Sequence, residues 1–267
     1  NIIESNCKSI RKKICWYGAP EGKIDIFKKN DLVLTPSVDL SKDLEKAGIN
    51  SQVLEHAFEP RTLSLLNIDK RKNKFCFIGS LTVGADWHEK RIQYLERLSK
   101  EIDIDIYSNL EKPSLGQICK KKIISFRQQI CKLITKYEKS VERINYYADE
   151  TNLPDYRLNF ESPIIKRIKP SVYGIDMLRV LSSYTLSFNM HIPLARMQAC
   201  NMRLTEALGV GTCLVSDFKK NNSLYFSEYE KICTYESLDE LVIKSKHLIE
   251  NRSLTSEISE NLQEKIL

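Results

Sequence analysis

Apolar and polar residues along the first sixty positions follow the rhythm of repeated strand and helix units. Short apolar runs at 14–17 and 32–35 end at glycine or proline, as strands often do. Residues 39–48 carry leucine and alanine at helical spacing and end in a glycine suited to a helix C-cap. A third strand is expected at 52–58. Successive units of this kind predict a parallel sheet.

A second series of units begins after a charged stretch at 67–74. A strand is expected at 75–78, followed by a helix with an apolar face and by alternating isoleucines at 102–106. Residues 114–148 interrupt this rhythm with helical spacing among many lysines. We interpret them as an inserted helical hairpin that packs against the core or contacts a membrane surface.

The strand and helix rhythm resumes near residue 173 and continues to the C-terminus. The elements expected there are a helix at 175–181, a strand at 185–190, a helix at 201–208, strands at 213–216 and 231–235, and two closing helices. The first closing helix opens at Ser237 with Glu240 three residues later, which is capping-box spacing.

The two series predict an α/β protein with two Rossmann-like, doubly wound domains. Residues 1–65 are expected to be the remainder of an N-terminal domain with its linker. Residues 66–267 are expected to form a C-terminal domain with a helical insertion at about 112–165. The first domain is shorter than such a domain needs, so we expect it to be truncated.

Composition limits the class of protein. With 42% hydrophobic and 28% charged residues, the 267-residue chain resembles soluble globular proteins. It has neither a membrane-spanning run nor a signal peptide, which predicts a cytoplasmic protein that can associate peripherally with the inner face of a membrane. The eight cysteines lack CxxC spacing and lie mostly among apolar residues, so buried thiols are expected in preference to disulfides or zinc.

The net charge of +6 comes from separate basic clusters and not from one continuous patch. No recognised nucleic-acid motif accompanies these clusters, so we expect no nucleic-acid partner. A basic balance does suit phosphate-bearing substrates or an anionic membrane surface.

Candidate chemistry follows the expected strands, because ligands of open α/β sheets bind beyond the carboxyl ends of the strands. Gly79 and Ser80 follow the strand at 75–78, and a glycine there lets a phosphate approach main-chain N–H groups. His191 follows the strand at 185–190 and can donate to a phosphate or sugar oxygen. A plain tight turn and a structural histidine remain the alternatives.

The most informative segment is the helix expected at 201–208. Asn201 suits the N-cap, which places Arg203 in the first turn, where the helix dipole and a guanidinium both favour an anion. Glu206 lies one turn further along nearly the same face, where a carboxylate can accept hydrogen bonds from both hydroxyls of a ribose. A surface ion pair between Arg203 and Glu206 is the alternative.

Several segments together resemble the C-terminal domain of GT-B glycosyltransferases, most closely the spore-maturation-type family. The similar segments are GIDMLRVLSSYTLSFNMH, NMRLTEALGVGTCLVSDF and FSEYEKICTYESLDELVIKSKHLIEN, which cover roughly residues 170–262. They carry the pattern Asn-x-His, then Asn-x-Arg-x-x-Glu-Ala-x-Gly-x-Gly, then a strand that ends in Asp. FCFIGSLTVGADWHEKRIQYLERL resembles the opening of that domain, and VLEHAFEP resembles the linker before it.

The resemblance implies transfer of a sugar from a nucleotide-sugar donor to a glycan, lipid-linked or protein acceptor, as in polysaccharide biosynthesis. The donor-binding residues that it implies are Gly79, Ser80, Tyr173, Gly174, Asn201, Arg203 and Glu206. Glu206 would bind the ribose, and Arg203 together with the turn at Gly79 and Ser80 would bind the diphosphate. Tyr173 and Gly174 would lie against the base. His191 would line the cleft and is the catalytic candidate.

No cofactor and no metal are expected, because GT-B enzymes stabilise the leaving diphosphate with helix ends and basic side chains. Gln198 stands eight positions before Glu206, where related retaining enzymes carry a second glutamate, so retention and inversion both stay open. A nucleotide-sugar epimerase of the same fold and a non-catalytic nucleotide-sugar-binding module are the alternative functions.

Overall fold

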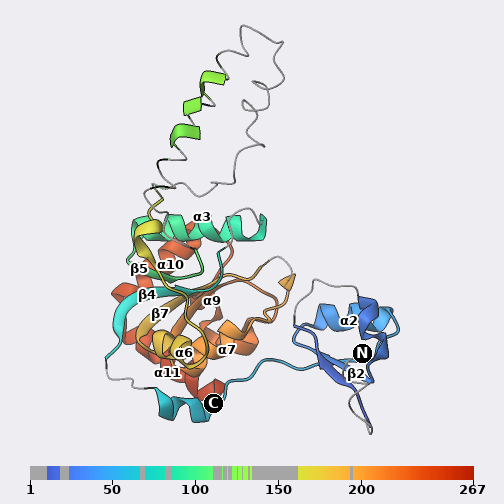
Figure 1. The fold of residues 1–267 in the computed structure, drawn as a ribbon. Helices are drawn as coiled ribbons and strands as arrows, with labels where there is room; N and C mark the ends of the chain where they lie inside the picture. Colours follow the sequence, from blue (N-terminus) through green and yellow to red (C-terminus); the bar gives the residue numbers. More distant parts are fainter. Residues whose placement is uncertain are drawn as a thin grey trace. The chain divides into compact units, whose positions relative to one another are not determined.

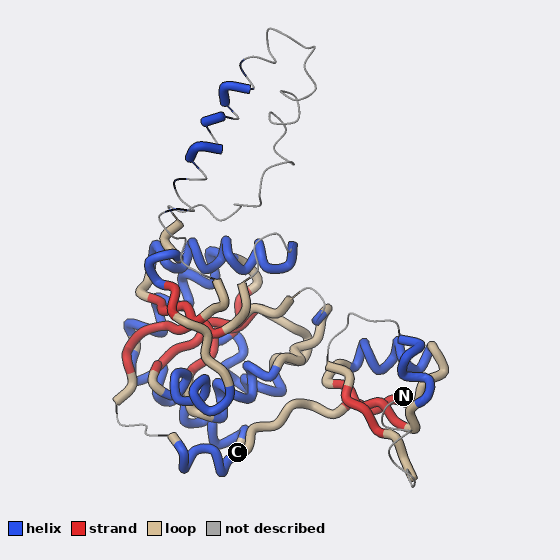
Figure 2. The backbone as a smooth tube through the Cα atoms, viewed as in Figure 1, coloured by secondary structure: helices blue, strands red, loops and turns tan. Residues whose placement is uncertain are grey.

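The computed structural model describes residues 11–18, 24–66, 70–81, 86–110, 162–192 and 195–267, together with scattered helical positions between 116 and 133. It divides into two compact units, one made of residues 1–76 and 173–267 and the other of residues 77–172. Its strands form a three-stranded sheet and a six-stranded sheet, and every recorded strand pairing is parallel (Figures 1 and 2).

The three-stranded sheet confirms the parallel arrangement expected near the start of the chain. Its strands are β1 (Ile14–Trp16), β2 (Leu32–Thr35) and β3 (Ser51–Val53), in the order β1-β2-β3. Helix α2 (Val38–Lys46) connects β2 to β3, and the short 3-10 helices η1 (Ile24–Lys29) and η2 (Pro60–Leu65) flank the sheet in sequence. Ser37 caps α2 by accepting a hydrogen bond from the N–H of Leu40.

The predicted strand at 52–58 is too long. The structure ends β3 at Val53, although the N–H of Leu54 still donates to the carbonyl of Thr35 at 2.9 Å. The neighbouring strand β2 ends at Thr35 because Pro36 follows, so the next residues have no strand beside them in this sheet.

The six-stranded sheet has the strand order of a doubly wound fold. Its strands are β4 (Lys72–Ile78), β5 (Ile104–Tyr107), β6 (Ile168–Lys169), β7 (Tyr184–Asn189), β8 (Cys213–Asp217) and β9 (Thr234–Tyr235). They follow the order β6-β5-β4-β7-β8-β9, so the direction of winding reverses between β4 and β7. Ligands of doubly wound folds bind beyond the carboxyl ends of the strands at such a reversal.

Helices connect these strands and bury the apolar faces that their sequences predict. They are α3 (Asp86–Glu101), α6 (Gly174–Ser182), α7 (Met202–Gly209), α8 (Ser223–Phe226), α9 (Glu230–Cys233), α10 (Leu238–Glu250) and α11 (Arg252–Ile266), with 3-10 helices η4 (Ile165–Arg167) and η6 (Ser227–Tyr229). Helices α6, α7 and α11 lie together on one side of the strands (Figure 1). Within the described ranges, no helix has the length and apolar character needed to cross a bilayer.

The central strands and the helix beside them form a closely packed core. Leu186 and Phe188 on β7, Leu214 on β8, and Leu204 and Leu208 on α7 are each at most 1% exposed. The seven described cysteines form no disulfide, and Cys213 and Cys233 are among the buried ones. This core fixes α7 against the two strands that carry most of the candidate site.

One predicted strand differs from the structure, and one predicted insertion lies largely outside the described residues. The strand expected at 231–235 is mostly wrong, because residues 230–233 form the helical turn α9 and only Thr234 and Tyr235 reach β8, at Ser216 and Asp217. The helical insertion expected at 112–165 lies largely outside the described residues, and the described positions between 116 and 133 are helical.

Candidate functional site

The N-terminus of α7 is built as the sequence predicts. Asn201 has an extended backbone, and its side-chain oxygen accepts a hydrogen bond from the N–H of Arg203 at 2.6 Å. Its amide nitrogen donates at 2.9 Å to the side-chain oxygen of Asn189, the last residue of β7. The cap therefore satisfies one free N–H of the helix and also ties the helix to the carboxyl end of β7.

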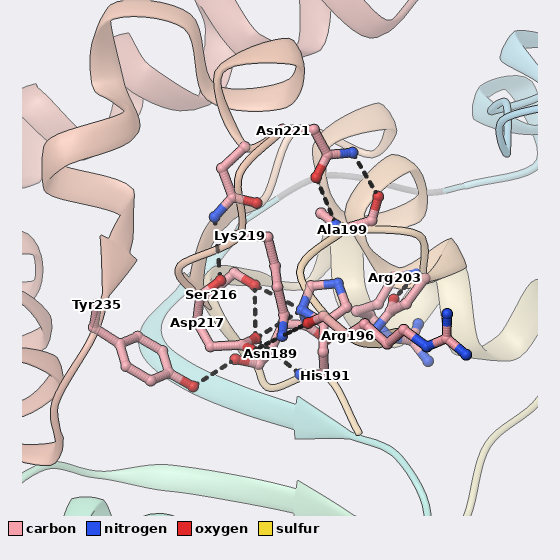
Figure 3. A network of polar contacts seen from close by, with 12 residues as sticks. Asn189, His191, Arg196, Ala199, Arg203, Ser216, Asp217, Lys219, Asn221 and Tyr235 are labelled. Carbon is pink, nitrogen blue, oxygen red and sulfur yellow. Dashed lines mark hydrogen bonds and ion pairs between the residues drawn. The ribbon is translucent and has the colours of Figure 1, made fainter. Parts of the chain in front are cut away.

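Asn189 is the centre of a buried polar network that sequence reasoning missed (Figure 3). Its amide nitrogen donates to the hydroxyl of Ser216 on β8 at 2.8 Å, and the hydroxyl of Tyr235 on β9 donates to its main-chain carbonyl at 3.0 Å. These bonds join the ends of β7, β8 and β9 to α7 through Asn201. The sequence signalled Asn189 only as the first residue of the Asn-x-His pattern at a strand end.

Arg203 and Glu206 lie together on α7, and both side chains are largely buried. Their nearest charged atoms, Nη1 and Oε2, are 2.9 Å apart, and Nη1 also contacts the sulfur of Met177 on α6 at 3.0 Å. The predicted spacing thus does produce the i, i+3 ion pair. The side chains are only 16% and 21% exposed, however, so this is not the surface pair that was the alternative.

Burial opposes the charge on both members of this pair. It lowers the pKa of Arg203, although Glu206 acts in the opposite direction, and it raises the pKa of Glu206, although Arg203 opposes that change. For both groups burial is the largest cause, so the two charges do not fully compensate each other's desolvation. Ionisable groups held in this way are typical of binding and catalytic sites.

His191 is paired with Asp217 at the ends of β7 and β8. Asp217 Oδ1 accepts hydrogen bonds from the main-chain N–H of His191 at 2.8 Å and from its Nδ1 at 2.7 Å. The ammonium of Lys219 lies 3.4 Å from the other carboxylate oxygen. The imidazole is fully buried, and its Nε2 has no hydrogen-bond partner within the described part of the chain.

Opposing influences act on the carboxyl group of Asp217. Burial raises its pKa, but the hydrogen bonds from His191 and the charge of Lys219 outweigh burial and bring the pKa below its usual value. In the tautomer whose Nδ1–H donates to Asp217, Nε2 is the acceptor nitrogen. The strand-terminal Asp217 was part of the sequence pattern, but its pairing with His191 was not predicted.

The depressed pKa of Asp217 predicts a dependence of stability on acid. Its contribution is present above the unfolded pKa of about 3.9 and is lost as pH falls through the folded value. Asp217→Asn is expected to lower the free energy of unfolding by about 1 to 2 kcal/mol at pH 7. The gap between wild type and variant, measured by urea unfolding, should close below about pH 4.

Asp176→Asn is the matched control, because Asp176 pairs with Arg179 on the exposed surface of α6. It should change stability by at most about 0.5 kcal/mol. A gap between wild type and Asp217→Asn that persists unchanged at pH 3 would contradict the assigned role of the carboxylate.

Two loops that follow β7 and β8 are held together by polar contacts (Figure 3). The side chain of Asn221 accepts from the N–H of Ala199 at 2.6 Å and donates to its carbonyl at 3.0 Å. Lys219 donates to the carbonyl of Arg196 at 2.7 Å, and Arg196 has a φ of 50°, which is unusual for a residue with a side chain. The segment after His191 is therefore fixed to the loop after β8.

The remaining predicted residues lie at other element boundaries. Tyr173 and Gly174 open α6: the tyrosine is 75% exposed and the glycine has a φ of 54°. Gly79 follows β4, and its N–H donates to the carbonyl of Tyr107 at 3.1 Å. A side chain at Gly79 would also collide with the ring of Phe77, whose nearest atom lies 2.9 Å from an ideal Cβ position.

Contacts within one compact unit connect most of the predicted site residues. Asn201, Arg203 and Glu206 share α7, and the network through Asn189 connects this helix with the β7 and β8 ends that hold His191. Helix α6, which Tyr173 and Gly174 begin, packs against α7. Gly79 and Ser80 belong to the other compact unit.

The C-terminal end of α7 is held by side chains distant in sequence. The guanidinium of Arg71 donates to the carbonyls of Val210, at 2.8 Å, and Gly211. The side chain of Gln263 on α11 donates to the carbonyl of Gly209 at 2.8 Å. These bonds satisfy carbonyls that a helix end leaves free, and burial lowers the pKa of Arg71.

The C-terminal part of the chain, which contains this site, is similar to a known protein family. Residues 135–267 match the model of the glycosyl transferase-like family. No curated protein sequence is significantly similar to the chain.

Solved structures with a similar fold include an alpha-glucosyltransferase and a beta-glucosyltransferase. An alpha-glucosyltransferase in complex with UDP and DNA aligns with 98% of this chain and 69% of its own, at 12% identity and a TM-score of 0.58. TarM aligns with 91% of this chain at 15% identity and a TM-score of 0.52, and T4 phage BGT in complex with UDP-glucose with 96% at 10% and 0.50. The chain spans 41% of TarM and 70% of BGT.

These likenesses and the two parallel sheets define an α/β fold of the GT-B type, as the sequence predicts. The match to the glycosyl transferase-like model covers the C-terminal part of the chain. The candidate donor residues on α6 and α7, together with His191, lie within the matched range.

Proposed function

We propose that this protein transfers a sugar from a nucleotide-sugar donor, and that α7 holds the donor. The observation that carries the proposal is the largely buried ion pair of Arg203 and Glu206 in the N-terminal part of a capped helix. When Glu206 turns to a ribose, a diphosphate would replace it as the anionic partner of Arg203. The family match to a glycosyl transferase-like domain supports this assignment.

The donor would occupy the reversal point of the six-stranded sheet. In this proposal Arg203 binds the diphosphate, and Glu206 accepts hydrogen bonds from the ribose hydroxyls. The turn at Gly79 and Ser80, taken by itself, is proposed as a phosphate-binding turn. The exposed ring of Tyr173, with Gly174 beside it, offers a flat surface for the base. The fixed cationic groups would stabilise the leaving diphosphate without a metal ion.

Asn201 and His191 have supporting roles in this scheme. Asn201 fixes the helix end from which Arg203 projects. His191 is the catalytic candidate, because Asp217 orients its ring and leaves Nε2 as an acceptor for a hydroxyl proton. Since the imidazole is fully buried in this structure, the role requires its Nε2 to become accessible when the acceptor binds. We propose a glycan, lipid-linked or protein hydroxyl as the acceptor.

Thermal unfolding against a panel of nucleoside diphosphates and their sugars tests the donor site. A ligand at a hundred times its dissociation constant should stabilise the protein by about 2.7 kcal/mol, which raises the melting temperature by roughly 2 to 4 °C. UDP is the first ligand to try because two structurally similar proteins bind UDP or UDP-glucose. The shift should occur both with magnesium and with EDTA.

No shift with any nucleotide would contradict the donor site. If a nucleotide sugar binds, product analysis separates transfer from the alternatives. Release of free nucleoside diphosphate supports transfer, an isomerised nucleotide sugar would indicate an epimerase, and binding without turnover for any acceptor would indicate a non-catalytic module.

A further inference from the structure

A buried arginine lies behind the turn that follows β4. Arg91, on α3, is only 9% exposed, and its Nη1 donates to the main-chain carbonyl of Ser80 at 3.1 Å. Its guanidinium carbon lies 5.7 Å from the centre of the Phe77 ring. An arginine is rarely buried to this extent, because removing a guanidinium from water is costly. Its position next to a glycine turn therefore needs a reason.

The surrounding residues fix the peptide group between Ser80 and Leu81 at both ends. Arg91 holds its carbonyl, and the side chain of Asn109, just after β5, accepts from its N–H at 2.9 Å. The imidazole of His88 also hydrogen-bonds the Ser80 main chain. Two elements, α3 and the end of β5, thus fix the peptide group that follows Ser80 in the turn.

The positive charge in this cluster belongs to Arg91. Burial lowers the pKa of His88, and the nearby guanidinium lowers it further, so the imidazole is mainly neutral at pH 7. A guanidinium keeps its charge at that pH. A fixed cation beside a turn raises the local potential for an anion, and the bond to Ser80 places that cation immediately next to the turn.

We propose that Arg91 is a positioning residue for nucleoside diphosphate binding: it orients the Ser80 turn and supplies a fixed positive charge behind it. This inference rests on the proposed function, in which Gly79 and Ser80 hold the diphosphate. It adds a residue on a different helix from Arg203 and assigns it to the phosphates alone. Replacing Arg91 should therefore leave the affinity for the phosphate-free nucleoside unchanged.

The test compares a nucleoside diphosphate with its phosphate-free nucleoside. UDP and uridine, or the matching pair for whichever base the thermal panel selects, are titrated by calorimetry into wild type and Arg91→Met. The variant is expected to bind UDP about tenfold more weakly, the size of one charge-assisted hydrogen bond, and uridine as before. The ratio of the two affinities is a readout that a general loss of stability would not change.

Lys90→Met is the matched control, because Lys90 is the preceding residue, carries the same charge and is exposed. It should leave the UDP-to-uridine ratio within about twofold of wild type. Arg91→Lys, which keeps the charge and loses the planar fork, should fall between wild type and Arg91→Met and serves if the methionine variant does not fold.

The outcomes separate this inference from the proposed function. Wild type that binds UDP no better than uridine would overturn both. Wild type that prefers UDP, with an unchanged ratio in Arg91→Met and Arg91→Lys, would overturn the role of Arg91 and leave the donor site standing. An equal loss in Lys90→Met would reduce the effect to net charge and overturn the positioning role.

Discussion

Replacing Arg203 by alanine is expected to weaken binding of a nucleoside diphosphate by roughly 10- to 150-fold, or about 1.5 to 3 kcal/mol. The reason is its place in the first turn of α7, where its hydrogen bonds to phosphate would be charge-assisted and partly shielded from water. Calorimetric titration of UDP into wild type and Arg203→Ala at one fixed salt concentration measures the difference.

Arg179→Ala provides a control with the same local geometry. Arg179 pairs with Asp176 at i, i+3 on α6, but the two side chains are 52% and 70% exposed. Its loss should change the UDP affinity by no more than about twofold. If Arg203→Ala binds UDP as tightly as Arg179→Ala does, the diphosphate is not held at α7.

A second arm of this experiment separates phosphate from ribose recognition. If Glu206 accepts from the ribose hydroxyls, wild type should bind 2′-deoxy-UDP about fivefold to tenfold more weakly than UDP, the size of a hydrogen bond. Glu206→Ala should bind both ligands alike, because the partner of the missing hydroxyl is already gone. A preference for UDP that survives in Glu206→Ala would assign the ribose to another residue.

Gly211→Ala is expected to lower the free energy of unfolding by about 2 to 4 kcal/mol, more than any other substitution proposed for this protein. Gly211 has a φ of 72°, which costs about 1 kcal/mol for a residue with a side chain. An ideal Cβ there would also lie 2.8 Å from Gln263 and 2.9 Å from Arg71. Moving these side chains would break the hydrogen bonds with which they hold the end of α7.

Gly48→Ala isolates the backbone part of this effect. Gly48 has a φ of 74°, but an added Cβ would meet nothing within 4 Å. The control should therefore lose only about 1 kcal/mol, measured by urea unfolding under the same conditions. Equal losses in the two variants would mean that Arg71 and Gln263 move aside without cost.

Local patterns predicted the parts of the site that depend on local structure. Helix α7 follows from a capping asparagine and a periodic apolar face, and the structure places Asn201, Arg203 and Glu206 on it as the spacing requires. The helix after Ser237 was equally predictable, since Ser237 accepts from the N–H of Glu240. Such features need only a few consecutive residues, so they can be recognised in the sequence.

Contacts between distant segments were beyond the reach of that reasoning. His191 was found as a polar residue after a strand, but its partner Asp217 comes from the next strand of the sheet. Nothing in the sequence distinguished Arg91, which is buried, from the neighbouring Lys90, which is exposed. The strand expected at 231–235 failed for the same reason, because pairing with the short end of β8 decides how many residues become extended.

The pairing of β4 with β7 also has a consequence for how this protein reaches its native state. The hydroxyl of Ser187 donates to the carbonyl of Cys76 across a sequence separation of 111 residues, in the middle of the six-stranded sheet. A chain must close that long loop before the pairing contributes any stability, and non-local strand pairs slow folding. Newly synthesised chains should therefore expose the edge of β4 that pairs with β7 until β7 has emerged from the ribosome, and during this interval the chain is prone to aggregation.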